Sequence, residues 1–188
     1  AAEDDFMPPC GHIAGIYRRT DYQVGVHKAP ANEIIEGVLD LELQLTNQEQ
    51  ARLNPAGINC LRSRPGRGIR VWGARTLSVD ASWVFINTRR LLFKLSRWIE
   101  LNLHNVTFEL HTQQLWTFIE NELTVYLNSL VEAGQLLDFY VKCDEETNPK
   151  AERNQGKVMT EIGLAPAIPA EFIVVRVMHG ESGITITG

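Results

Sequence analysis

The sequence predicts an α+β protein in which a mixed sheet packs against two long amphipathic helices. Two long segments, residues 84–103 and 113–133, carry apolar residues at helical spacing. Runs typical of short strands lie on both sides of this pair, within residues 58–72 and 139–177. Helices and strands do not alternate strictly, as they would in a parallel βαβ fold, and this favours the α+β class.

The first sixty residues predict two short helices and one strand. Residues 11–21 predict a short helix that ends in a run of polar residues. In residues 39–45 four leucines alternate with polar residues, which is the period-two pattern of a half-buried strand. Thr46 and Glu49 have the spacing of a capping box, which predicts a helix that Pro55 ends.

A hairpin and two helices follow in the middle of the chain. Residues 58–61 and 69–72 read as strands around one proline and two glycines, which predicts a hairpin or a tight crossover. The first long helix carries most of its basic residues off its apolar stripe. The second is expected to begin after Thr112 as N-cap and to end before Gly134.

The last third of the chain returns to strands. These are predicted at residues 139–143, 157–164 and 172–177, with a polar insert at residues 144–156. A glycine-containing break then precedes a separate β-branched run, residues 184–187, that has no obvious hairpin partner.

Composition excludes several classes of protein. The chain has 188 residues, of which 44% are hydrophobic and 22% charged, and this fits one globular domain, or one domain with short arms, rather than a disordered or disulfide-stapled chain. No apolar run approaches the roughly 20 residues of a membrane-spanning helix, and no secretion signal is visible. Cys10, Cys60 and Cys143 are far apart, so we expect reduced, buried thiols in a cytosolic setting.

Charge is unevenly distributed along the chain. Residues 60–100 hold nine basic and two acidic residues, a net +7, and because the whole chain carries −5 the remainder carries −12. A basic band in an acidic chain favours binding to nucleic acid, or to an acidic patch on another protein, including another copy of this chain. The alternative is a solvated helix with arginine stems packed against the core.

The sequence contains no pattern of residues typical of catalysis. The glycines at 66, 68 and 73 match neither a dinucleotide fingerprint nor a phosphate-binding loop, and the five histidines lack the spacing of a helical metal pair. We therefore predict no enzyme, no catalytic residue, no cofactor and no metal site.

Two features suggest assembly instead. The terminal run, formed by Ile184, Thr185, Ile186 and Thr187, either pairs within its own sheet or adds to the sheet edge of another subunit. If the polar insert forms a short helix, Lys150, Arg153 and Lys157 project from one face. They then contact an acidic partner, or simply lie in a solvated turn.

Several segments together resemble one known family. The clearest are LNPAGIN at 53–59, GRGIRVWGARTLS at 66–78 and WVFINTRRL at 83–91. Further matches in the same order are PPCGHIAG at 8–15 with Arg18, Thr20 and Asp21, KAPAN at 28–32, FYVKCD at 139–144, IGLAP at 162–166 and PAEFI at 169–173. In these residues the chain resembles the C-terminal domain of contractile tail sheath proteins, which occur in contractile-tailed phages and related bacterial injection particles.

The resemblance implies a structural subunit that polymerises into stacked six-fold rings, or a helix, around an inner tube. Its contraction would drive the tube through a target cell envelope. The implied partners are other copies of the chain, the inner tail tube protein, and baseplate and tail terminator proteins, without nucleic acid or membrane insertion. Assembly would take place in the bacterial host cytoplasm, and the subunit would belong to a virion tail or a released injection particle.

The resemblance also implies a division of the chain. Residues 1–179 correspond to the C-terminal core domain, and residues 180–188 to a linker and an extended arm whose strand, Ile184 to Thr187, is exchanged with a neighbouring subunit. The family's N-terminal arm and protruding domains have no counterpart in this sequence. Lys150, Arg153 and Lys157 become a possible tube contact. Basic residues that either face a neighbouring subunit or brace the domain are Arg67, Arg70, Arg75, Arg89 and Arg90. The rival hypothesis is a nucleic-acid-binding module that uses the basic band at residues 62–97.

Overall fold

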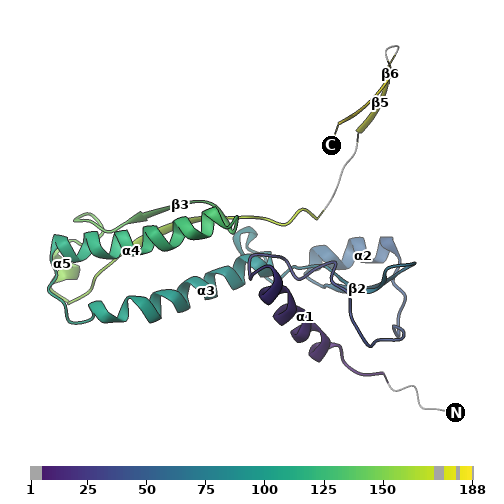
Figure 1. The fold of residues 1–188 in the computed structure, drawn as a ribbon, viewed down its shortest axis with the longest axis horizontal. Helices are drawn as coiled ribbons and strands as arrows, with labels where there is room; N and C mark the ends of the chain where they lie inside the picture. The colour runs from purple at the N-terminus through teal and green to yellow at the C-terminus, as the bar shows by residue number, and fades with distance from the viewer. Residues whose placement is uncertain (1–5, 172–175, 181–182, 188) are drawn as a thin grey trace.

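Two long helices form the frame of the elongated part of the molecule (Figure 1). The computed structural model describes residues 6–171, 176–180 and 183–187. Helix α3 (Ile86–Asn102) and helix α4 (Gln113–Glu132) are joined by a loop that contains the 3₁₀ turn η3 (His104–Val106). Buried leucines of α3 pack against buried leucines of α4, so the amphipathic stripes of the two helices face each other.

The ends of α4 follow from local hydrogen bonding. The Thr112 hydroxyl accepts the backbone N–H of Leu115, as an N-cap does. At the other end Gly134 has φ +66°, and its N–H and that of Gln135 donate to carbonyls of the last turn. Because only glycine adopts this left-handed conformation without strain, Gly134 ends the helix and reverses the chain.

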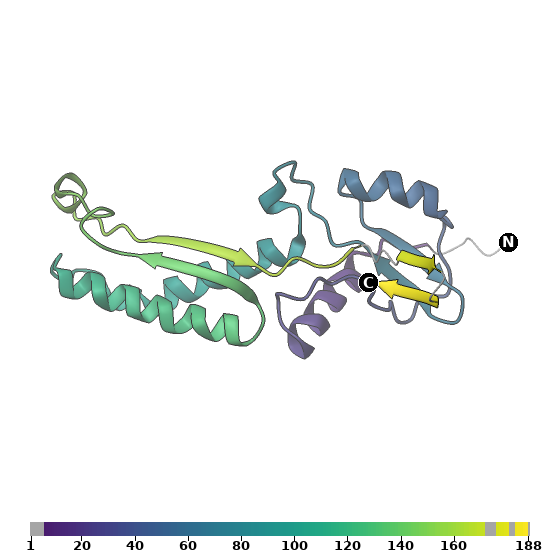
Figure 2. The same ribbon diagram turned by 90° about the horizontal axis from the view of Figure 1, so that it is seen from above.

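A long hairpin covers α4. Strands β3 (Leu136–Lys142) and β4 (Glu161–Pro166) pair antiparallel, and the 18-residue connection between them forms the far end of the elongated part (Figures 1 and 2). The main core lies between α3, α4 and this hairpin. Its buried members are Leu91, Leu95, Leu127, Leu130 and Leu136.

The remaining elements build the other part of the molecule. They are helices α1 (Cys10–Gln23) and α2 (Asn47–Leu53), strands β1 (Cys60–Arg64) and β2 (Gly68–Trp72), and the 3₁₀ turns η1 (Asn54–Ala56) and η2 (Ala81–Trp83). A second core joins α1 to β2 and the loop between α1 and α2 through Ile16, Ile35, Ile69 and Val71. Arg90 of α3 donates from both terminal guanidinium nitrogens to the Asp21 carboxylate of α1, which ties this part to the long helices.

Two local predictions are confirmed by the structure. Thr46 and Glu49 form the reciprocal hydrogen bonds of a capping box at the start of α2. Between β1 and β2 the Arg67 N–H donates to the Arg64 carbonyl at 2.9 Å, and Gly66 has φ +70°, so the chain makes a tight hairpin turn.

The predicted mixed sheet is wrong. The described strands form three separate two-stranded antiparallel sheets, β1–β2, β3–β4 and β5–β6, the last of which is described below. Each strand pairs with the next strand along the chain. A parallel pair needs a crossover connection, and none of these hairpins provides one.

The strand predicted at residues 39–45 is also absent, because this segment is irregular. Leu41 packs partly against the second core, but Leu39 is fully exposed and Leu43 is 71% exposed. Both line an open groove of about 640 Å³ with Phe6 and Met7. The leucines therefore do not share one buried face, and no strand among the described residues pairs with this segment, so it gains no ladder of hydrogen bonds.

The thiols differ from expectation at one position. Cys60 and Cys143 are buried, and burial raises the pKa of both. Cys10, at the start of α1, is exposed, contrary to the prediction of three buried cysteines.

Among the described residues, no helix is long and apolar enough to cross a membrane.

Candidate assembly interface

The terminal run predicted as a free strand has a partner in its own chain. Strand β6 (Gly183–Thr187) pairs antiparallel with β5 (Arg176–Gly180), and His179 lies opposite Ile184. The expectation that no hairpin partner lies next to this run is therefore wrong. Of the strand predicted at 172–177, residues 176 and 177 lie in β5, and residues 172–175 lie outside the described residues.

The β5–β6 hairpin stands apart from both cores (Figure 1). Within the described part of the chain its two strands pair only with each other. A two-stranded hairpin is marginally stable alone in water, and its outer edges present N–H and C=O groups to which another strand can pair. The hairpin is therefore a candidate surface for joining copies of the chain.

The polar insert between β3 and β4 forms the opposite end of the molecule (Figure 2). Asp144 accepts the backbone N–H groups of Thr147 and Glu146, each at 3.0 Å, and the Thr147 bond chiefly lowers the pKa of this carboxyl group. The fully buried Asn148 then fastens the insert to the chain just before β4, because its amide nitrogen donates to the Met159 carbonyl at 2.9 Å and its amide oxygen accepts the Met159 N–H at 2.7 Å.

The insert contains a short helix, as the sequence suggested, but it does not carry all three basic residues. Helix α5 (Lys150–Arg153) has four residues, and the chain turns at Gly156 with φ +70°, so Lys157 lies beyond the helix. Arg153 lies 3.4 Å from Glu145 and 5.7 Å from the Trp116 ring, while Lys157 lies 3.6 Å from Glu152. Lys150 is exposed and forms no ion pair within the described residues.

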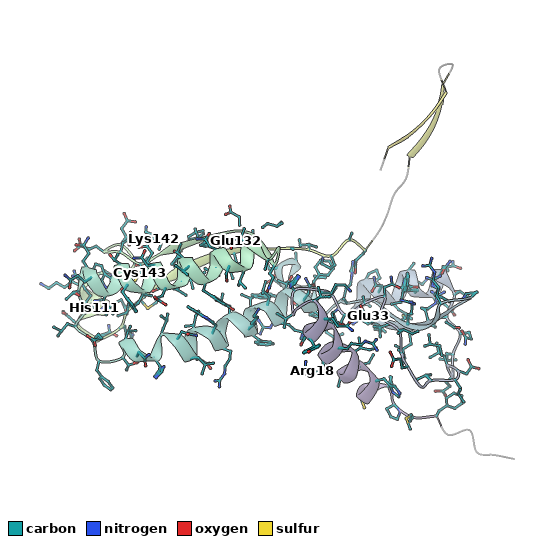
Figure 3. The ribbon with its side chains drawn as sticks, viewed as in Figure 1. Arg18, Glu33, His111, Glu132, Lys142 and Cys143 are labelled. Carbon is teal, nitrogen blue, oxygen red and sulfur yellow. The ribbon has the colours of Figure 1, made fainter. Side chains whose placement is uncertain are left out.

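His111 lies at this same end of the molecule (Figure 3). The Trp116 indole N–H donates to His111 Nδ1 at 3.0 Å, and His111 Nε2 lies 2.8 Å from the Lys157 carbonyl. His111 therefore joins the α3–α4 loop to the insert.

In the part of the chain that the structure describes, no group of three or more His, Cys, Asp or Glu side chains could hold a metal ion.

The arginines of the basic band bond mainly within the molecule. Arg70 donates to the Asn32 carbonyl at 2.6 Å, and Arg75 forms a bidentate pair with Glu171. Arg90 holds Asp21 and lies over the Tyr17 ring. These three side chains thus bond to partners within their own chain.

The other two arginines are more accessible. Arg67 is exposed in the β1–β2 turn. Arg89 is exposed on α3, where its guanidinium lies 4.9 Å from the Trp83 ring centre and 4.8 Å from that of Phe93. A role for either at a neighbouring subunit stays a prediction.

Comparison with protein families covers almost all of the chain. The model described as the phage tail sheath protein central domain matches residues 2–77, and the phage tail sheath C-terminal domain matches residues 78–178, which is more than half of the chain. The chain belongs to the phage tail sheath protein family. The boundary between the two sheath domains falls just after Arg75 and before η2.

Known relatives and solved structures agree with this assignment to the tail sheath family. The tail sheath protein of Vibrio phage KVP40 is 29% identical over 91% of this chain and 26% of its own length. A putative prophage major tail sheath protein of Pseudomonas aeruginosa is 27% identical over 87% of this chain and 44% of its own. A chain in the cryo-EM structure of the anti-feeding prophage baseplate is 38% identical, with a TM-score of 0.87, over 92% of this chain and 50% of its own.

A second solved structure describes a contracted assembly. A chain of the PVC sheath complex, an extracellular contractile injection system in its contracted state, is 30% identical with a TM-score of 0.87, and the match covers 94% of this sheath chain and 52% of that one. This chain thus spans about half the length of these solved relatives and less than half of the two curated ones.

Sequence reasoning assigned no role to two residues that hold these surfaces in place. Asn148 fixes the insert, and Glu171 fixes the chain ahead of β5. For Asn148 the available signal was the Asn-Pro pair before a short helical run, since asparagine often bonds the backbone at such turns. Glu171 carried no local signal, because its partner Arg75 is 96 residues away.

Proposed function

We propose that this chain is part of a structural subunit of a contractile tail sheath, which polymerises into stacked rings or a helix around an inner tube. Its contraction drives the tube through a target cell envelope. The proposal rests on the match of both sheath domains over residues 2–178, together with the likeness to a sheath chain solved in a contracted assembly. The role is structural and includes no catalysed reaction.

Contact between copies is assigned to the C-terminal hairpin. We infer that Ile184, Thr185, Ile186 and Thr187 add to the sheet of a neighbouring subunit, through the edge of β6 that β5 leaves open. Main-chain hydrogen bonds of this kind persist while rigid domains rotate between two packings. A head-to-tail contact whose rotation does not close then generates a helix.

Contact with the inner tube is assigned to the opposite end of the molecule. The exposed Lys150 of α5, with Arg153 and Lys157 nearby, supplies positive charge for an acidic tube surface. Single exposed charge pairs contribute about 0–1 kcal/mol each, so only repetition around and along the tube makes the contact strong. We further propose baseplate and tail terminator proteins as partners, and assembly in the bacterial host cytoplasm.

The test is negative-stain microscopy of the full chain beside a version that ends at His179. This truncation removes β6 and leaves both cores intact. We expect ordered rings or tubes from the full chain and folded monomers from the truncated one, with circular dichroism as the check of folding. Equal assembly by both would show that β6 does not join copies. Lys150→Ala is the matched control, because it is expected to self-assemble normally and to lose only tube binding.

A further inference from the structure

The segment that follows β4 is fastened to the rest of the molecule at two points. The buried Asn87 of α3 donates its amide N–H groups to the Ala167 carbonyl at 3.2 Å and to the His27 carbonyl at 3.0 Å. Four residues later Glu171 accepts hydrogen bonds from Arg75, with Nε–Oε1 at 3.0 Å and an Nη–Oε2 distance of 2.5 Å. The chain is therefore held at Ala167 and again at Glu171.

Arg75 is itself held rigidly. The Asn59 side chain donates to the Arg75 carbonyl and accepts the Arg75 N–H, both at 2.8 Å. One asparagine thus fixes both polar groups of the Arg75 backbone. The ion pair is also partly shielded from water, because its side chains are 22% and 17% exposed, so it is held more firmly than an exposed surface pair.

The position of this pair gives it control over the C-terminal hairpin. Glu171 precedes residues 172–175, and β5 begins at Arg176. We propose that the Arg75–Glu171 pair is a releasable clamp that sets how far the hairpin reaches from its own subunit. This inference rests on the proposed function of the hairpin as the link between copies, and it adds a positioning role for Arg75 and Glu171.

The gain in reach follows from chain geometry. Among the described residues, the contact nearest to the start of β5 is at Glu171 with the clamp closed and at Ala167 with it open. Four more residues are then free to extend. At roughly 3.3–3.6 Å per residue the hairpin gains up to about 14 Å of reach. Linked subunits can separate by that distance without losing a strand-to-strand hydrogen bond.

An ion pair suits this role better than an apolar anchor would. When the clamp opens, water solvates both charged groups, so no apolar surface is exposed to neighbouring chains. The bidentate contacts share one carboxylate and one guanidinium, so they break together, and the segment is either held or released.

The first test measures reach in the isolated chain. Spin labels are placed at Met178→Cys and Glu132→Cys in a Cys10→Ser background, and their separation is measured by pulsed electron resonance. Glu171→Gln and Arg75→Gln should broaden the distance distribution and extend its upper limit by up to about 14 Å. The matched control is Arg90→Gln, which breaks a bidentate pair of similar exposure, 23% and 24%, without touching the C-terminal segment.

A second set of variants separates reach from stability. Four residues inserted after Glu171 leave the clamp intact and should extend the upper limit of the distance as Glu171→Gln does. Exchange of the two charges, Arg75→Glu with Glu171→Arg, should restore the wild-type distribution. The clamp is refuted if the Gln variants fold normally and keep the wild-type distances, or if Arg90→Gln broadens them equally.

These distances are measured on dilute single chains, below the concentration at which copies assemble, and therefore do not depend on assembly. Failure of the truncation experiment would therefore count against the proposed function alone, and unchanged distances would count against the clamp alone.

Discussion

Asn148 offers the sharpest test of how the tip of the molecule is held. The residue is fully buried, and its side chain satisfies both the N–H and the C=O of Met159. Asn148→Ala leaves these two backbone groups without their amide partner, at a position where the asparagine side chain itself is fully buried. An unsatisfied buried group costs about 1–3 kcal/mol. The Met159 carbonyl keeps a weak contact from the Cys143 thiol at 3.7 Å, so we expect a total loss of about 2–4 kcal/mol.

Urea denaturation followed by circular dichroism measures this loss. With a slope of about 2 kcal/mol per molar urea, the midpoint should fall by about 1–2 M. Asn154→Ala is the matched control, because Asn154 is exposed in the same insert, and such surface changes stay within about 0.5 kcal/mol. If the two variants unfold at the same urea concentration, the amide of Asn148 does not hold the insert.

Three further outcomes are expected. In thermal melts, Gly57→Ala should destabilise the fold by at least about 1 kcal/mol more than Gly66→Ala. Both glycines have positive φ, but a Cβ at residue 57 would lie 2.5 Å from a backbone oxygen, whereas a Cβ at residue 66 would meet open space. The hydrogen bond from Arg75 holds the pKa of Glu171 below its usual 4.5. In urea titrations, the wild type should therefore be more stable than Glu171→Gln by the full amount above about pH 5, and this difference should shrink as the pH falls through the lowered pKa. In a thiol-reagent assay at pH 8, the exposed Cys10 should react fast. Cys143 should react slowly, because burial raises the pKa of the Cys143 thiol, and equal rates for the two would contradict this burial.

Local sequence signals predicted the ends of elements well. The capping box at Thr46 and the glycine at 134 act through hydrogen bonds and backbone angles within a few residues, so the sequence alone contains the needed information. The alternating leucines at 39–45 misled for the opposite reason. A strand requires a partner, and the alternation of apolar and polar residues does not show whether a partner is present.

The candidate site was less predictable than the fold. That β6 lies at the chain end and α5 in the polar insert could be anticipated from composition and glycine breaks. The pairing of Arg75 with Glu171 could not, because contacts between distant residues depend on the completed fold rather than on any local pattern. The short length of α5 was missed because helical spacing by itself does not say where a helix stops.

The pairing of each described strand with its neighbour in sequence also bears on how the protein is made. Sheets that close through short or local connections need little loop closure before their contacts form, and such topologies fold quickly. No strand of the described chain waits for another copy before its own hairpin can form. A newly synthesised subunit can thus reach its native state first and meet other copies afterwards, and we expect growth of the polymer to depend on subunit concentration rather than on a slow folding step.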